Sequence, residues 1–207
     1  MADQQAKTLG VVLFPEFELL DVFGPAEMFG NLHGVVTVTM VAQQSGPVAS
    51  AQGPSVLATH GFEDCPHLDW ILVPGGFGTR TEVDNAVLLD WLARRAHAAE
   101  VVMTVCTGTA LLARTGVLDG RRATTNKMAF AWVAEQGPRV NWVKQARWVE
   151  DGKFATSSGV SAGIDMALAV IARVFGTELS DRLAIATEYE WHRDASWDPF
   201  AKVHGLV

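Results

Sequence analysis

Short apolar runs alternate with helix-length segments along this chain, and the alternation strongly limits the possible fold. Trp70–Val73 and Val101–Val105 are almost wholly apolar, which is typical of strands buried on both faces of a sheet. Between them, Asn85–Ala99 carries apolar residues at helical spacing. Strand–helix–strand repeats favour a largely parallel sheet covered by helices. The sequence therefore predicts an α/β fold.

The same patterns predict the remaining elements. Further strands are expected at Leu9–Phe14, Val35–Ala42, Gln145–Val149 and Lys153–Thr156, and further helices at Glu18–Leu32, Thr109–Thr115, Lys127–Gln136, Ala162–Phe175 and from Ser180 onward. Residues 45–60 are expected to form loop and short strand. Asp151-Gly152 predicts a hairpin, and Ser161 is predicted to cap the helix after it, with Asp165 near the positive end. No linker or repeat divides residues 1–207, so we expect one domain.

Composition limits the classes of partner. The 207 residues carry a net charge of −7, which disfavours nucleic acid as the main partner. No apolar run approaches the ~18 residues of a membrane span, and the stretch Met1–Lys7 lacks a signal-peptide pattern. The two cysteines, Cys65 and Cys106, belong to no disulfide framework and no metal-binding cluster. We expect a cytoplasmic protein without a metal site.

Cys106 lies where the apolar run Val101–Val105 changes to the small-residue run Thr107–Ala110. This junction predicts a strand, a sharp turn and a helix. A side chain at such a turn stands at the carboxyl edge of the sheet, where open α/β folds bind ligands, and beside helix N–H groups that favour a thiolate. A buried structural thiol is the alternative, but the Cys-Thr-Gly-Thr context favours a nucleophile.

Two further segments are expected at the same edge. Gly75 and Gly76 follow the strand that ends at Val73, and glycine amides can point at a developing oxyanion, although a plain loop is the alternative. Asp21 lies among apolar neighbours, where a carboxylate is costly without a polar purpose. It is predicted to be a general acid/base with a pKa raised by burial, the alternative being a capping or solvent-facing residue. Glu16 and Glu18 are weaker candidates because they precede the apolar run.

Six motifs in order resemble the ThiJ/PfpI superfamily, and within it the isocyanide hydratase branch. They are Phe14-Pro15-Glu16, Leu20-Asp21-x-x-Gly24-Pro25, Pro74-Gly75-Gly76, Val105-Cys106-Thr107-Gly108, Gly120-Arg121-Arg122-Ala123-Thr124-Thr125 and Ser161-Ala162-Gly163-Ile164-Asp165. The resemblance covers roughly residues 8–190. It implies a flavodoxin-like three-layer sandwich with a mostly parallel central sheet, a strained nucleophile elbow and a homodimer.

The resemblance also implies roles for single residues. Cys106 matches the nucleophile and Asp21 the catalytic aspartate of the hydratases. Gly75, Gly76 and Thr107 match backbone donors around the thiolate, and Val160 matches a position next to the nucleophile.

The chain departs from the resemblance at Asn126. Relatives tend to carry a histidine after the Thr-Thr pair, whereas Asn126 follows Thr124-Thr125 here. An asparagine cannot accept a proton from a thiol, so a Cys-His hydrolase mechanism is disfavoured. A mechanism that pairs a cysteine with a carboxylate is unaffected. Asn126 is expected to line the pocket together with Val160.

The leading hypothesis is a cofactor-independent isocyanide hydratase that forms a thioimidate on Cys106 and releases an N-substituted formamide. A glyoxalase- or deglycase-like enzyme acting on α-oxoaldehydes is the first alternative. The second is a non-enzymatic sensor whose Cys106 is oxidised to a sulfinate. A transcription regulator is set aside because the chain reaches only Val207, without an appended DNA-binding domain. The expected partner is a small molecule, not nucleic acid or membrane.

Overall fold

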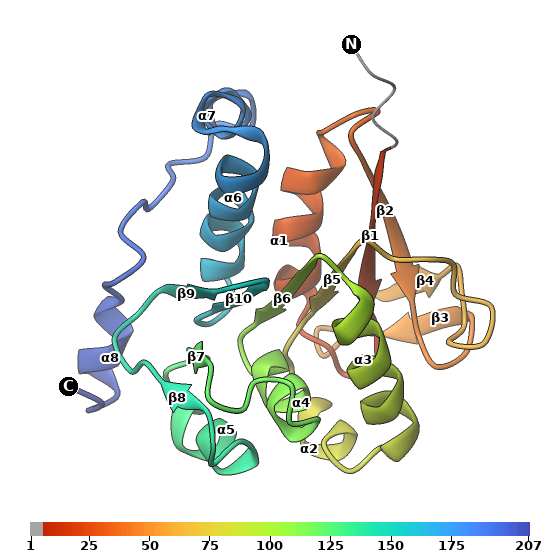
Figure 1. Cartoon of the computed structure of the whole chain (residues 1–207), viewed down its shortest axis with the longest axis horizontal. Helices are drawn as coiled ribbons and strands as arrows, with labels where there is room; N and C mark the ends of the chain where they lie inside the picture. Colours follow the sequence, from red (N-terminus) through yellow and green to blue (C-terminus); the bar gives the residue numbers. More distant parts are fainter. Residues whose placement is uncertain (1–5) are drawn as a thin grey trace.

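The computed structural model describes residues 6–207 and centres on a six-stranded sheet in the order β2-β1-β5-β6-β10-β9 (Figure 1). Its strands are β1 (Lys7–Val12), β2 (Val36–Val41), β5 (Trp70–Val73), β6 (Val101–Val105), β9 (Trp148–Asp151) and β10 (Phe154–Ser157). All neighbours pair in parallel except β9 and β10, which form an antiparallel hairpin. The α/β fold with a mostly parallel sheet is thus confirmed. The first five residues, within the stretch used to predict cellular targeting, lie outside the described residues.

Burial explains the order of the strands. Every residue of β5 and β6 is buried, and these two strands occupy the middle of the sheet, where helices cover both faces. The edge strand β2 has only its two end residues buried. The two strands that are almost wholly apolar therefore lie at the centre of the sheet, and the less buried strand β2 lies at its edge.

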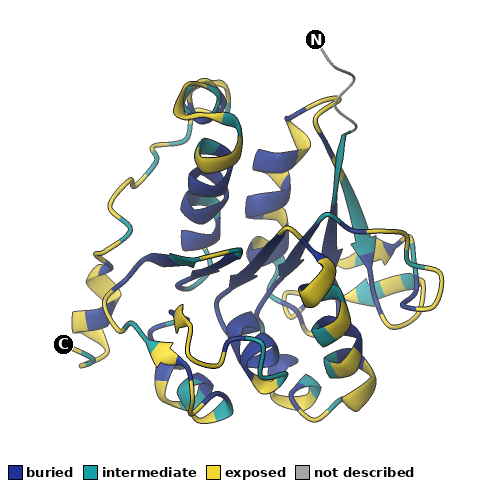
Figure 2. Cartoon of the chain, viewed as in Figure 1, coloured by how far each residue is buried: buried dark blue, intermediate teal, exposed yellow. Residues whose placement is uncertain are grey.

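Helices cover the two faces of the sheet in separate layers (Figure 1). One layer holds α1 (Leu19–Gly30), α6 (Ala162–Phe175) and α7 (Thr177–Ala186). The other holds α2 (Thr79–Glu82), α3 (Ala86–Ala98), α4 (Gly108–Arg114) and α5 (Phe130–Gln136). The sides of α1 and α3 that face the sheet are buried and their outer sides exposed, whereas α6 is buried along most of its length (Figure 2). This arrangement is the expected flavodoxin-like sandwich.

Smaller elements lie outside the central sheet. They are the antiparallel pair β3 (Gly46–Ala49) and β4 (Ser55–Ala58), the short parallel pair β7 (Arg122–Ala123) and β8 (Asn141–Trp142), and α8 (Pro199–Val203) near the C-terminus. The hairpin β3–β4 falls in the region predicted as loop and short strand. Among residues 6–207, no helix is long and apolar enough to cross a membrane.

One local prediction was wrong at the start of α6. Ser161 has helical backbone angles, and its side chain makes no capping hydrogen bond in the described part of the chain. Asp165 lies in the first turn of α6, as predicted, and is fully buried. Its carboxylate accepts hydrogen bonds from Arg147 Nε at 2.6 Å and from the Tyr189 hydroxyl at 3.0 Å. Asp165 therefore ties the C-terminal segment to the core.

Candidate active site

Cys106 lies in the turn between β6 and α4 with a φ of +56°, a region that non-glycine residues rarely occupy. Its amide donates to the carbonyl of Ser158 at 3.1 Å, and its carbonyl accepts from Thr125 Oγ1 at 2.7 Å. Such backbone strain costs about 1–3 kcal/mol and persists only where surrounding contacts fix it. These contacts to two separate segments hold Cys106 in the predicted elbow.

The Cys106 side chain is buried, with 7% of its surface exposed. Burial raises the pKa of the thiol, and the negative charge of Asp21 raises it further. Hydrogen bonds from the Thr107 backbone and hydroxyl and from the Val160 amide lower the pKa and partly offset this rise. The donors around the sulfur are thus Thr107 and Val160. The predicted donors Gly75 and Gly76 are not among them.

Asp21 lies in the first turn of α1 and is fully buried. Its Oδ2 accepts a 2.8 Å hydrogen bond from the Gly75 amide, while Oδ1 has no hydrogen-bond partner within the described residues. Burial raises the Asp21 pKa well above its usual range, and the Gly75 hydrogen bond lowers it only partly. The expected raised pKa is therefore present, and its cause is desolvation.

The thiol and the carboxyl form an electrostatically coupled pair. Two negative charges placed close together in a buried site are strongly disfavoured, so such a pair keeps one shared proton. Asp21 Oδ1 has no hydrogen-bond partner among the described residues. An ionised carboxylate oxygen is costly when it is buried without a hydrogen bond, so this observation agrees with a proton shared by the pair. The pair can hold a nucleophile and a transferable proton at the same time.

The glycine loop acts on this pair indirectly. The Gly75 amide is directed at Asp21, and the Gly76 amide donates to Thr107 Oγ1 at 3.0 Å. Both N–H groups are therefore engaged by protein groups, so their hydrogen bonds support a positioning role, not the oxyanion role expected of them. A Cβ atom at Gly75 would lie 2.6 Å from the Thr107 amide nitrogen. Only glycine allows this close approach.

The loops after β1 and β5 are joined by backbone hydrogen bonds. The Glu18 amide donates to the Gly75 carbonyl at 2.8 Å, and the Gly78 amide donates to the Glu16 carbonyl at 3.2 Å. Phe17 and Gly76 form an isolated antiparallel bridge. The segment that leads into Asp21 and the loop that fixes its carboxylate are thus one connected backbone unit.

A cavity of about 120 Å³ opens over Cys106. Its lining residues are Glu18, Gly76, Phe77, Arg80, Cys106, Thr107, Asn126, Met128, Ala129 and Val160. Phe77 and Met128 are 70% and 74% exposed, so they form the outer part of its wall. The cavity brings Cys106, Thr107, Asn126 and Val160 together as predicted. Asp21 is fully buried and does not line the cavity, and it acts there through its coupling to Cys106.

Asn126 contributes to the wall mainly by shaping it. Its Oδ1 accepts a hydrogen bond from the Ala129 amide at 2.9 Å, at the start of the turn that leads into α5. Its Nδ2 lies against Gly159, where an added Cβ would be 2.4 Å away. Of the described residues that line the cavity, none is a histidine. This lining offers no partner for a Cys-His mechanism.

Five residues of this wall are not among those predicted from the sequence. They are Glu18, which is a weaker candidate in the sequence, and Phe77, Arg80, Met128 and Ala129, which no motif indicates. The Arg80 guanidinium lies over the Trp132 ring, 4.3 Å from its centroid. Phe77 directly follows the Gly75-Gly76 pair, and this adjacency was the one available signal. Arg80 lines the cavity from α2, and Met128 lines it from the loop before α5. No sequence motif indicates either position.

Comparisons with known proteins agree with the fold and the motifs. The model of the DJ-1/PfpI family matches residues 7–173. An isonitrile hydratase from Pseudomonas putida is 36% identical over 184 residues, covering 89% of this chain and 79% of the relative. The transcriptional regulator CdhR from Pseudomonas aeruginosa is 33% identical, but the match covers 68% of this chain and only 41% of the regulator.

Solved structures show the same architecture. A ThiJ/PfpI family protein from Pseudomonas syringae superposes with a TM-score of 0.84 at 29% identity, covering 92% of this chain and 78% of that protein. A DJ-1 superfamily protein from Salmonella typhimurium superposes with a TM-score of 0.77 at 25% identity, covering 89% of this chain and all of that protein. The family match, the relatives and the fold agree, and this chain belongs to the DJ-1/PfpI family.

Proposed function

We propose that this protein adds water to the terminal carbon of an isocyanide and releases an N-substituted formamide. The observation that carries the proposal is the buried pair of Cys106 and Asp21 beneath a small cavity whose described lining contains no histidine. The 36% identity to an isonitrile hydratase supports the choice of substrate class. The reaction needs a nucleophile and one mobile proton, and the pair supplies both.

In the first step the Cys106 thiolate forms a bond to the isocyanide carbon. The same carbon takes the proton held by Asp21, which gives a thioimidate, R–N=CH–S–Cys106, and leaves Asp21 as a carboxylate. The raised pKa of Asp21 suits it to this role, because a carboxyl group with an ordinary pKa would have lost its proton at neutral pH.

In the second step water adds to the thioimidate carbon. Asp21 accepts a proton from the water and returns it to the nitrogen, giving R–NH–CH(OH)–S–Cys106. When the carbon–sulfur bond breaks, Asp21 takes the hydroxyl proton, and the formamide and the thiolate are released. One water molecule is consumed and both groups return to their starting states. No cofactor enters the proposed cycle.

The leaving thiolate is stabilised by fixed donors. The Thr107 and Val160 groups that lower the Cys106 pKa favour the anion each time it forms. Val160 itself has a φ of +46°, so its amide is held in an unusual orientation beside the sulfur. In this proposal Val160 lines the pocket, and its amide also donates a hydrogen bond to the sulfur.

We also propose a homodimer in a reducing compartment such as the cytoplasm. Leu20 and Phe23 on α1 are 42% and 43% exposed, and Leu57 on the β3–β4 hairpin is 62% exposed. Leu20 and Phe23 are three residues apart and therefore share one face of α1, and we propose that a second copy covers this apolar face. Cys65 and Cys106 are both free, which suits a reducing environment.

The test is a substrate comparison with purified protein. Cyclohexyl isocyanide should be converted to N-cyclohexylformamide by the wild type, and Cys106→Ala should lower kcat/KM by at least ~10³-fold. Cys65→Ser is the matched control and should retain full activity. Turnover of methylglyoxal without turnover of the isocyanide would instead favour the glyoxalase-like alternative. Protein that turns over neither substrate, and only gains oxygen at Cys106 under peroxide, would contradict both enzymatic hypotheses.

A further inference from the structure

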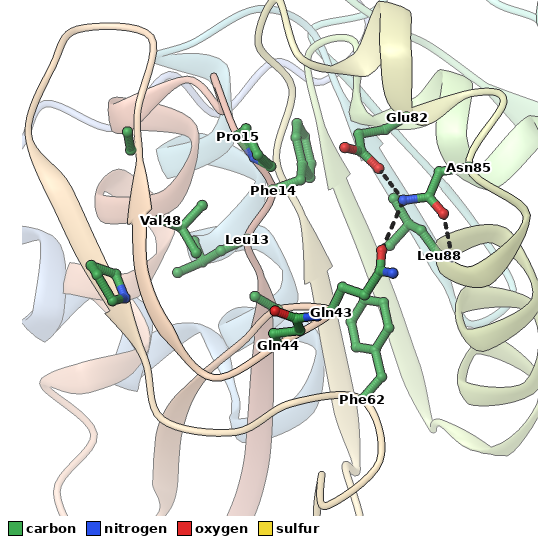
Figure 3. Close-up of a pocket in the computed structure, with 13 residues that line it drawn as sticks. Leu13, Phe14, Pro15, Gln43, Gln44, Val48, Phe62, Glu82, Asn85 and Leu88 are labelled. Atoms are coloured by element: carbon green, nitrogen blue, oxygen red, sulfur yellow. Dashed lines mark hydrogen bonds between the residues drawn. The ribbon is translucent and has the colours of Figure 1, made fainter.

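A second and larger cavity, of about 390 Å³, lies apart from Cys106 (Figure 3). It is bounded by segments that follow β1, β2 and β5 and by the β3–β4 hairpin. Its lining residues are Leu13, Phe14, Pro15, Ala42, Gln43, Gln44, Pro47, Val48, Ala49, Phe62, Glu82, Asn85 and Leu88. None of these described residues lines the Cys106 cavity, so the two sites are distinct.

The topology of the sheet favours a ligand at this position. The helix after β1 leads outward to β2, whereas the helices after β5 lead in the opposite direction to β6. The strand order therefore reverses between β1 and β5, and the connecting helices lie on opposite faces of the sheet (Figure 1). In open α/β sheets such a reversal opens a crevice at the carboxyl ends of the strands, where ligands bind.

Most of the cavity wall is apolar and fixed. Phe14, Val48 and Leu88 approach it from three different elements (Figure 3). Phe62 forms another part of the wall, and its ring stacks on Trp91 with centroids 4.3 Å apart and planes inclined by 14°. A volume of a few hundred cubic ångströms with an apolar lining is typical of small-molecule sites.

One side of the cavity carries a hydrogen-bonded polar group. Asn85 Nδ2 donates to Gln43 Oε1 at 3.0 Å and to Glu82 Oε2 at 2.7 Å, and Asn85 Oδ1 accepts from the Leu88 amide (Figure 3). Asn85 thus holds Glu82 in place. Among residues 6–207, Glu82 Oε1 makes no hydrogen bond, and no lysine, arginine or histidine pairs with this carboxylate. One carboxylate oxygen is left available at an apolar cavity.

The charged side chains that line this cavity and the depression beside it are all acidic. An adjoining depression shares Gln43, Gln44 and Phe62 with it and adds the carboxylates of Glu63 and Asp64. No basic side chain is found among the described residues that line either hollow. An anionic ligand would be repelled by Glu82, whereas a cation would gain a partner in it.

We propose that this cavity binds a small amphiphilic cation, an alkyl or arylalkyl ammonium compound. Its apolar body packs against Phe14, Val48, Phe62 and Leu88, and its ammonium group donates to Glu82. The site is independent of the Cys106 chemistry, so it does not depend on the proposed hydratase function.

The probes that test the proposal are 2-phenylethylammonium and phenylacetate, which share an aromatic body and differ in the sign of the charge. Calorimetry and amide chemical-shift mapping on the full-length protein should show saturable binding of the ammonium probe, with shifts at Gln43, Asn85 and Leu88. Glu82→Gln should weaken binding at least ~10-fold, which corresponds to about 1.4 kcal/mol. Glu178→Gln, which changes an exposed carboxylate on α7, should leave the affinity unchanged.

Two further variants complete the test. Val48→Phe should weaken binding by filling the cavity, and the amide spectrum of each variant reports whether it is folded. Cys106→Ala should bind the probe as the wild type does, whatever its activity toward isocyanides. Equal binding of phenylacetate, shifts centred on the Cys106 cavity, or undiminished binding to folded Glu82→Gln and Val48→Phe would each overturn the proposal.

Discussion

The Gly75 amide donates a 2.8 Å hydrogen bond to the Asp21 carboxylate, joining residues that are 54 positions apart in the sequence. This contact fixes one oxygen of Asp21 and leaves the other free.

Asp21→Asn should separate the hydration reaction from thiol reactivity. The variant should lose isocyanide turnover by about 10²–10⁴-fold because an amide cannot carry the proton. Its Cys106 should nevertheless react faster with iodoacetamide at pH 7–8. The substitution removes the form of the pair in which the shared proton lies on sulfur and the charged Asp21 raises the Cys106 pKa. Alkylation is followed by mass spectrometry in a Cys65→Ser background. Glu18→Gln removes another carboxylate of the cavity and should change the rate much less. An unchanged or slower rate in Asp21→Asn would contradict the coupling.

The same substitution should stabilise the fold at neutral pH. Asp21 has a folded pKa above the ordinary carboxyl value of 3.8, so the folded state binds its proton more tightly than the unfolded state does. The resulting stabilisation is complete below about pH 3.8 and is lost as the pH rises to the folded pKa.

The Asp21→Asn variant has no titrating group at this position, so it does not lose stability in this way as the pH rises. Thermal unfolding should therefore show little difference between variant and wild type near pH 3.5 and a higher Tm for the variant at pH 7, by about 2–4 °C for each kcal/mol. A variant that is less stable than the wild type at pH 7 would refute the assignment of Asp21 as a buried acid.

Gly75→Ala should damage both stability and activity. The new Cβ would lie 2.6 Å from the Thr107 nitrogen and 2.9 Å from Asp21 Oδ2, and overpacking of this kind costs about 1–3 kcal/mol. Gly30→Ala is the matched control, because nothing lies within 4 Å of its added Cβ. It should be neutral or stabilising by up to about 1 kcal/mol. Denaturant unfolding measures both variants, and equal free energies of unfolding would count against the close approach.

Thr107→Val should lower kcat/KM and stability together. Thr107 Oγ1 accepts hydrogen bonds from the Gly76 amide and from the Thr79 hydroxyl, and an unpartnered buried donor costs about 1–3 kcal/mol. Thr107→Ser keeps the hydroxyl and should restore most of both quantities. Failure of Thr107→Ser to recover activity would show that the methyl group, not the hydroxyl, is what matters.

Much of the fold follows from local sequence pattern. The strands Trp70–Val73 and Val101–Val105 occur at the predicted residues, because each apolar run is bounded by turn or polar residues. The helix Ala162–Phe175 also matches, since its apolar face has a regular period. The elbow at Cys106 follows from the abrupt change of pattern at that residue.

The remaining features depend on tertiary contacts. The direction of the Gly75 and Gly76 amides is set by Asp21 and Thr107, which come from other elements. Asp165 lies in the first turn of α6 as predicted, but only the fold reveals that Arg147 is beside it. Such pairings join distant segments, so no local pattern can reveal them.

The joined loops after β1 and β5 have a consequence for how the substrate range of this site can change. Asp21 follows one of these loops and its amide donor lies in the other, and a larger side chain at Gly75 or Gly76 would collide with its neighbours. The turn beside the sulfur is tied to the same unit by the hydrogen bond from the Gly76 amide to Thr107 Oγ1. The side chains of Phe77 and Met128 make no part of these contacts and are exposed at the wall of the cavity. Under the proposed function, evolution can therefore replace the side chains that meet the substituent of a substrate while Cys106 and Asp21 stay as they are.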